Sequence, residues 1–174
     1  LHARARDPST LRVEDAPGVV TVLVPVSSGG LIAGIATAVK ARRPEARVIG
    51  IQPEQAAGAV RAFRAGALQA IPTPATIADA LVSACPGAVP FRHIQRSVDD
   101  LVTVTEDEIV DAVRFLATEA KLVVEPGGAV GVAALLAGRI PPAPGMTVAV
   151  LSGGNVDPGL LADLLRPPRE GSSR

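Results

Sequence analysis

Val19-Val-Thr-Val-Leu-Val-Pro-Val-Ser-Ser-Gly-Gly30 is the stretch of this 174-residue chain that decides the fold. Residues 19–24 are aliphatic and largely β-branched, which predicts a buried strand. Pro25 and the small residues up to Gly30 interrupt the run, and a segment rich in alanine and isoleucine then continues to Arg43. This order predicts a strand, a tight turn and a helix, the unit from which parallel sheets are built.

The absence of charge between residues 16 and 39 also fits a membrane span, because the run is long enough to cross a bilayer. The proline and the paired glycines stand in its middle, however, and the residues on the two sides differ in character. A soluble strand–turn–helix explains the run better. We therefore expect a cytoplasmic protein with no membrane partner.

The same alternation of strand and helix repeats along the chain. We expect strands at 19–24, 47–51, 101–104 and 147–151, an extended piece at 122–124, and helices at 31–43, 53–64, 126–137 and 158–165. A further helix begins at residue 105, because Thr105 and Glu108 form the pattern of a capping box. Four prolines between residues 66 and 100 predict an irregular segment there.

Strands that alternate with helices predict an α/β fold, an open and mostly parallel twisted sheet with flanking helices. Its core must be aliphatic, because the chain has no Trp or Tyr and three Phe. We expect residues 1–12 and 166–174 to be disordered.

The composition excludes several classes of protein. Seventeen Lys and Arg residues balance 17 Asp and Glu residues, and three phenylalanines cannot build a platform for stacked bases, so we expect no nucleic-acid partner. The single cysteine, Cys85, rules out a disulfide scaffold and a zinc cluster.

Two glycine-rich turns follow strands, where ligands bind in open α/β sheets. Ser27-Ser-Gly-Gly30, followed by Leu31, offers backbone N–H groups at a helix N-terminus, which suits a phosphate as well as it suits a plain turn. Ser152-Gly-Gly-Asn155 offers a hydroxyl, although an ordinary turn that caps the last helix explains it too. Together the two turns favour one shared site.

Several motifs together resemble one family. They are Val24-Pro-Val-Ser-Ser-Gly-Gly-Leu-Ile-Ala-Gly34, Thr76-Ile-Ala-Asp-Ala80, Val98-Asp-Asp100 with Val104-Thr-Glu-Asp-Glu-Ile109, Val124-Glu-Pro126 and Leu151-Ser-Gly-Gly-Asn-Val-Asp157. In this order they are similar to the carboxyl-terminal half of threonine dehydratase and serine racemase, pyridoxal-phosphate enzymes of the tryptophan-synthase-β fold type. The likeness runs from residue 13 to residue 165.

The resemblance implies roles for particular residues. Ser27, Ser28, Gly29, Gly30 and Leu31 stand where the family wraps the phosphate of pyridoxal 5'-phosphate with backbone amides. The family usually has four glycines in this turn, whereas this chain has serine at the first two positions. The backbone N–H donors of the turn are kept after that change. The serines cost stability only if the replaced glycine had a positive φ.

Three more positions match residues around the cofactor. Ser152 stands where the family hydrogen-bonds the pyridine nitrogen, and Ala80 replaces a glycine close to the cofactor. Glu125 matches an acidic residue that lines the active-site side, although a carboxylate at a helix N-terminus explains it as well.

The resemblance also marks what this chain does not carry. Some relatives bind a divalent metal with two carboxylates and a carbonyl, and the matching positions here are Gln52, Ala56 and Gly58. Without the carboxylates we predict no metal at that site. Tight Mg²⁺ or Ca²⁺ binding in calorimetry would contradict this.

The family's Schiff-base lysine and its loop for the substrate carboxylate lie in the amino-terminal half. Lys40 lies about 15 Å from the phosphate turn by helical rise, and Lys121 ends a helix. We interpret both as solvated surface residues and assign no catalytic residue. Cys85 is interpreted as a bystander thiol and His93 as a loop cap.

The resemblance therefore implies the carboxyl-terminal portion of a threonine/serine dehydratase, an ammonia-lyase of amino-acid metabolism, inactive as this chain alone. Three alternatives stay open: a serine/threonine racemase, another β-eliminating enzyme, and a non-catalytic remnant or split subunit that binds phosphate weakly. The implied partners are a small amino-acid substrate and either a homo-oligomer or the missing amino-terminal half.

Overall fold

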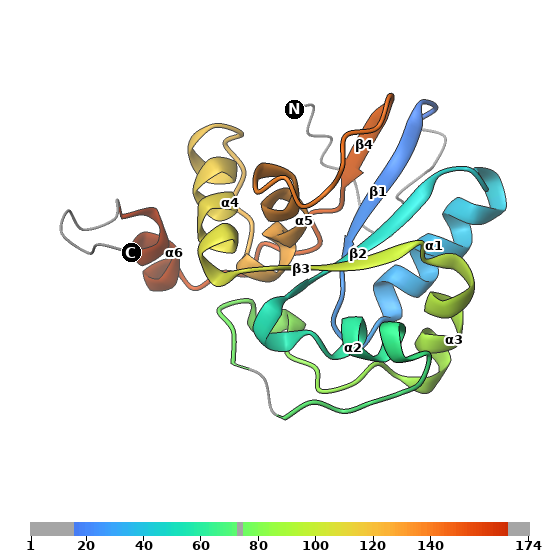
Figure 1. Ribbon diagram of the computed structural model, residues 1–174. Helices are drawn as coiled ribbons and strands as arrows, with labels where there is room; N and C mark the ends of the chain where they lie inside the picture. The colour runs from blue at the N-terminus through green and yellow to red at the C-terminus, as the bar shows by residue number, and fades with distance from the viewer. Residues whose placement is uncertain (1–15, 73–74, 167–174) are drawn as a thin grey trace.

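The computed structural model describes residues 16–72 and 75–166, and a four-stranded sheet lies at its centre (Figure 1). The strands are β1 (Val19–Pro25), β2 (Arg47–Pro53), β3 (Asp100–Val104) and β4 (Met146–Ala149), in the order β3-β2-β1-β4. All three pairings are parallel, which confirms the predicted α/β class.

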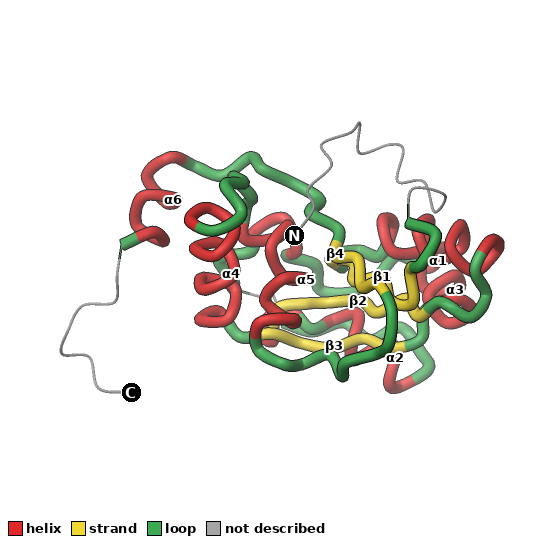
Figure 2. Tube along the Cα trace, turned by 90° about the horizontal axis from the view of Figure 1, so that it is seen from above, coloured by secondary structure: helices red, strands yellow, loops and turns green. Residues whose placement is uncertain are grey.

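Helices cover both faces of the sheet (Figure 2). They are α1 (Gly30–Arg42), α2 (Gly58–Ala65), α3 (Ala88–Ser97), α4 (Glu106–Thr118), α5 (Pro126–Leu136) and α6 (Pro158–Leu165), with short 3₁₀ turns at Glu54–Ala56 and Asp79–Leu81. Successive side chains of β1 point to opposite faces of the sheet, because side chains alternate along a strand. Leu23 packs in the cluster with α4 and α5, whereas Val22 and Val24 pack with α1 and α3.

The predicted irregular segment at 66–100 contains a helix, so that prediction was wrong for Ala88–Ser97. Pro90 is the third residue of α3, where the backbone N–H has no intrahelical partner and proline is tolerated. Residues 122–124 form no strand, and β4 ends at Ala149 rather than at residue 151.

Other expectations have definite outcomes. The last helix spans the predicted Pro158–Leu165, and the helix expected at 53–64 begins as a 3₁₀ turn before α2. The disorder expected for 1–12 and 167–174 lies outside the described residues, whereas Arg166 is described and ion-paired to Asp163. Among the described helices, none combines the length and apolar character that crossing a bilayer requires.

The capping box at the start of α4 is present as predicted. Thr105 Oγ1 accepts from Glu108 N at 3.2 Å, and Glu108 Oε2 accepts from Thr105 N at 2.9 Å. Glu108 Oε1 also accepts from Arg139 Nη2 at 2.7 Å, and this hydrogen bond raises the pKa of Arg139. One glutamate therefore joins the start of α4 to the chain beyond α5.

We expect Thr105→Ala to lower the free energy of unfolding by about 1 kcal/mol, because one N-terminal N–H of α4 loses its acceptor. Thr118→Ala, at the exposed end of the same helix, serves as the control and is expected to change stability by less than about 0.5 kcal/mol. Urea denaturation measures both. Equal losses for the two variants would show that the cap contributes nothing specific.

Candidate functional site

The two glycine-rich turns lie at the same edge of the sheet. The turn at 27–29 follows β1 and the turn at 152–155 follows β4, which is the parallel neighbour of β1. Val150 N donates to Leu23 O at 2.9 Å, so the pairing continues beyond the end of β4 toward the second turn. The topology therefore places both turns at one edge of the sheet, and a shared site stays a prediction.

The first turn presents backbone donors that the fold leaves unused. Within 16–72 and 75–166, no residue accepts a hydrogen bond from the backbone N–H of Ser27, Ser28, Gly29, Gly30 or Leu31. The first turn of α1, a 13-residue helix, contains no acidic residue. Unpaired N–H groups at a helix N-terminus attract an anion, and a phosphate fits this set. We call residues 27–31 the amide cradle.

Neighbouring segments hold the amide cradle in place. Val26 N donates to Ile51 O at 3.0 Å on β2, and Ser28 O accepts from Gly87 N at 2.9 Å just before α3. Gly29 caps α1 with φ 95°, and a Cβ built there would lie 2.8 Å from Ile94 Cδ1. Neither serine has positive φ, so serine at these positions causes no backbone strain.

Glu125 supports the second turn rather than capping its own helix. Its Oε2 accepts from Asn155 N at 2.9 Å, and its backbone N donates to Gly153 O at 3.1 Å. A Cβ on Gly153 would overlap the Glu125 carboxylate. No side-chain cap bond exists at the start of α5. Ser152 itself is exposed, so its hydroxyl is accessible to a ligand.

Ala80 lies near Glu125 at the start of α5. A Cβ built on Gly127 would lie 3.2 Å from Ala80 Cβ and 3.8 Å from Glu125 Oε1. The structure thus gathers Ala80, Glu125 and the Ser152 turn around the N-terminus of α5. The shared sheet edge relates this group to the amide cradle.

The positions matched to a metal site hold no suitable set of ligands. Gln52 is fully buried, and Ala56 is buried as well. A Cβ on Gly58 would lie 2.7 Å from Ala84 O, so backbone fills that space. Among the residues that the structure describes, no group of three His, Cys, Asp or Glu side chains could hold a metal ion. The absence of bound metal stays a prediction.

Neither lysine lies at the amide cradle. Lys40 is in the last turn of α1, at the opposite end of that helix from the cradle. Contrary to expectation it is not freely solvated: its Nζ donates to Ala46 O and pairs with Asp99 at 2.8 Å, and its side chain is 24% exposed. Lys121 follows α4, is exposed, and donates to Thr118 O.

His93 and Cys85 are the two further candidate side chains. His93 does not cap a loop, because it lies within α3, where a ring nitrogen is 3.3 Å from Thr37 Oγ1 on α1. Cys85 is half-buried in the loop before α3, and its interpretation as a bystander stays a prediction.

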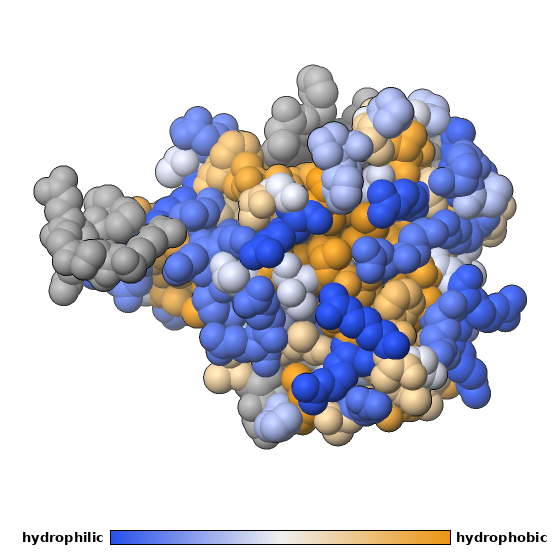
Figure 3. Space-filling model, in the orientation of Figure 1, coloured by the Kyte–Doolittle hydropathy of each residue, from blue (hydrophilic) through white to orange (hydrophobic). Residues whose placement is uncertain are grey.

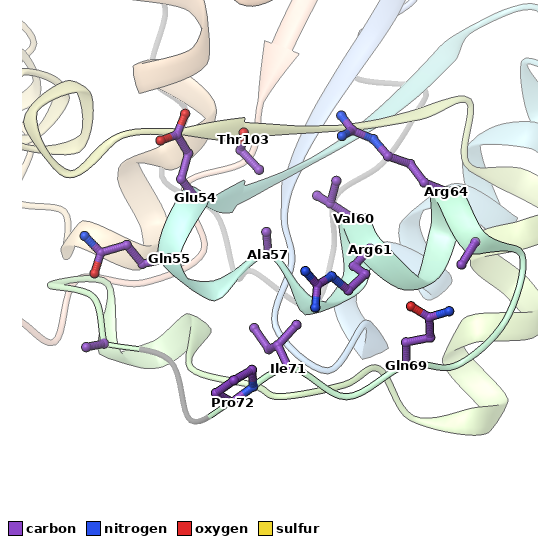
Figure 4. A pocket seen from close by; sticks show the side chains of 12 residues that line it. Glu54, Gln55, Ala57, Val60, Arg61, Arg64, Gln69, Ile71, Pro72 and Thr103 are labelled. Atoms are coloured by element: carbon purple, nitrogen blue, oxygen red, sulfur yellow. The ribbon is translucent and has the colours of Figure 1, made fainter.

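A hollow of about 820 Å³ lies between α2 and β3, and none of the residues that line it belongs to either turn (Figure 4). Arg61 and Arg64 line it from α2, and Thr103 lines it from β3. It adjoins β3, at the end of the strand order opposite β4. The sequence analysis does not predict this hollow, and the spacing of the two arginines by one helical turn is a signal from which it could be found.

Gly29→Ala is expected to lower the free energy of unfolding by about 1–3 kcal/mol. The substitution places a Cβ on a residue in the left-handed conformation, and that Cβ clashes in a packed position. Gly30→Ala is the matched control: a Cβ there meets no atom within 4 Å, so we expect a change of less than about 0.5 kcal/mol. Urea denaturation compares the two. Equal stabilities would contradict the packing of Gly29 against α3.

Comparison with known proteins agrees with this geometry. The L-threonine ammonia-lyase of Thermotoga maritima is 40% identical over 149 residues, which are 86% of this chain and 37% of that protein. The catabolic L-threonine dehydratase TdcB of Escherichia coli K12 is 40% identical over 147 residues, 83% of this chain and 45% of that one. The structure of maize serine racemase matches with a TM-score of 0.80 and 35% identity, over 87% of this chain and 47% of that chain.

The chain thus spans less than half the length of each of these relatives. The family described as pyridoxal-phosphate dependent enzymes matches residues 10–153. These residues include the first turn, β1 to β4, all of α5 and the first two residues of the second turn. The chain therefore belongs to the family of pyridoxal-phosphate-dependent enzymes.

Proposed function

We propose that residues 13–165 are the carboxyl-terminal portion of a threonine/serine dehydratase. The complete enzyme removes water from L-threonine or L-serine and yields a 2-oxoacid and ammonia. The observation that carries this proposal is the amide cradle, whose five N–H groups have no acceptor among the described residues and lie at the same sheet edge as the Ser152 turn. The choice of reaction is supported by two relatives, an L-threonine ammonia-lyase and a catabolic L-threonine dehydratase, which are each 40% identical to this chain.

In this proposal the amide cradle holds the phosphate of pyridoxal 5'-phosphate. Hydrogen bonds from N–H groups to a phosphate oxygen are charge-assisted and stronger than neutral ones. The positive end of the α1 dipole adds to them. When bound, the cofactor supplies an electron-withdrawing ring that acidifies the α-proton of an amino acid.

Ser152 and Glu125 have separate tasks at the other turn. The exposed Ser152 hydroxyl hydrogen-bonds the ring nitrogen, and a neutral partner leaves that nitrogen unprotonated. Glu125 accepts from Asn155 N and packs against Gly153, so it fixes the turn that presents Ser152. In this proposal Glu125 is a positioning residue.

Among the residues that the structure describes, neither lysine is placed at the cradle to take the α-proton. Lys40 lies in the last turn of α1 and is held by Asp99, and Lys121 follows the end of α4. We therefore propose that another polypeptide segment brings the lysine and the residues that bind the substrate carboxylate, and that this chain alone is inactive.

A serine racemase portion is the second candidate, since the maize enzyme matches with 35% identity. Both candidates require the same cradle and the same serine. Assays on L-threonine and L-serine, one for ammonia and one for the D-enantiomer, separate them once the lysine-bearing segment is supplied.

Pyridoxal phosphate is expected to bind this chain without a covalent bond. Borohydride reduction followed by peptide mapping should find no labelled lysine, whereas titration should shift the backbone amide resonances of the cradle. Ser152→Ala should weaken the binding of pyridoxal phosphate and leave that of inorganic phosphate unchanged, because only the former has a ring nitrogen. Label at Lys40 or Lys121 would overturn our assignment of both lysines.

Exposed apolar side chains lead to a prediction about association. Met146 on β4 is 47% exposed, and Leu135 and Leu136 at the end of α5 are 39% and 51% exposed. Figure 3 shows apolar areas between the charged ones over the strands. We expect the purified chain to self-associate, because apolar surface without cover favours association. A monodisperse monomer with a cooperative melt, seen by light scattering and calorimetry, would contradict this expectation.

A further inference from the structure

Gln52 is a polar side chain in the middle of the core. It is the penultimate residue of β2 and has no exposed surface. Among the described residues, Thr21 is the other buried polar or charged residue. A buried amide costs free energy unless its donors and acceptors are paired, so its hydrogen bonds show what it does.

The Gln52 amide joins three segments of the chain. Its Oε1 accepts from Ala59 N at 2.9 Å and from Val60 N at 3.0 Å, and its Nε2 donates to Val26 O at 3.2 Å. The two N–H donors require the amide oxygen on their side, which fixes the orientation of the amide group. Ala59 and Val60 belong to the first turn of α2, where backbone donors have no partner inside the helix.

Val26 is thereby held at both of its backbone polar groups. Its N donates to Ile51 O at 3.0 Å, and its O accepts from Gln52. The next residue, Ser27, is the first of the amide cradle. The position of the cradle relative to the sheet is thus set at Val26, the residue whose carbonyl accepts from Gln52.

We propose that Gln52 is a positioning residue for the amide cradle, with α2 as its anchor. This inference rests on the proposed function of the cradle as a phosphate site. The Gln52 amide suits the task because it both donates and accepts. An apolar side chain of the same length fills the space but makes none of these hydrogen bonds. An ionised carboxylate has no donor for Val26 O and places its negative charge against that carbonyl oxygen.

The test compares Gln52→Met, Gln52→Glu and the control Thr21→Val, which removes a polar group from the other buried polar residue. Amide hydrogen exchange at Val26 and Gly87 reports the order of the cradle, because these N–H groups donate to Ile51 O and Ser28 O. We expect exchange at both sites to become about tenfold faster in each Gln52 variant, relative to strand amides of β1, the effect of one lost hydrogen bond. Thr21→Val should leave the ratio unchanged.

Binding supplies a second readout, with inorganic phosphate, pyridoxal phosphate and pyridoxal as probes. Both Gln52 variants should weaken the two phosphate-bearing ligands by about tenfold and leave the affinity for pyridoxal unchanged. Equal loss for all three probes, or equal exchange changes in Thr21→Val, would reduce Gln52 to a general core stabiliser and overturn the proposal.

Gln52→Glu adds a dependence on pH that the methionine variant lacks. Burial raises the pKa of a carboxyl group, and the protonated form can donate to Val26 O as the amide does. The defect relative to wild type should therefore be small near about pH 5 and grow toward about pH 8 as the carboxyl ionises. A defect that does not change with pH would contradict the role of the donor. If Gln52→Met does not fold, this comparison within one variant still decides.

The two proposals fail in different ways. If wild-type chain binds neither phosphate nor pyridoxal phosphate, the proposed function of the cradle is wrong. The exchange rates at Val26 and Gly87 still decide whether Gln52 orders residues 26–29.

Discussion

The parallel pairing of β1 with β2 on one side and with β4 on the other is the constraint on which the remaining structure depends. Parallel strands end at the same edge, so segments far apart in sequence meet there. Val26 N bonds to Ile51 O on one side, and Val150 N bonds to Leu23 O on the other. A slip of this register by one residue would turn Leu23 toward the wrong core and separate the two turns.

The fold also requires helices to come close to the backbone of β2 and of the Ser152 turn. A Cβ on Gly50 would lie within 2.7 Å of Ile32 Cδ1 and Val26 Cγ2, and one on Gly128 would lie 2.8 Å from Gly153 O. These glycines let β2 accept the packing of α1, and let α5 lie against the turn that carries Ser152. Small residues thus bring helices near enough to support the turns, while longer residues such as Gln52 and Glu125 hold them by hydrogen bonds.

Short sequence patterns correctly predicted where α4 and α6 begin. The capping box of Thr105 and Glu108 and the proline that opens α6 are such signals, and the structure confirms both. α3 was missed because prolines around it were interpreted as breakers, although Pro90 lies in a helical turn that tolerates it. The pairing of Lys40 with Asp99 and the three bonds of Gln52 join residues distant in sequence. Spacing alone contains no signal for such contacts, and only the folded chain shows them.

β4 is the last strand in the order β3-β2-β1-β4, so within the described residues the outer row of its N–H and C=O groups has no neighbouring strand. Such an edge is a template on which another extended segment can pair. A strand added there would lengthen the sheet beside β4, the strand that leads into the Ser152 turn. The open border of the sheet and the Ser152 turn therefore lie together, because β4 is both the edge strand and the strand that leads into that turn.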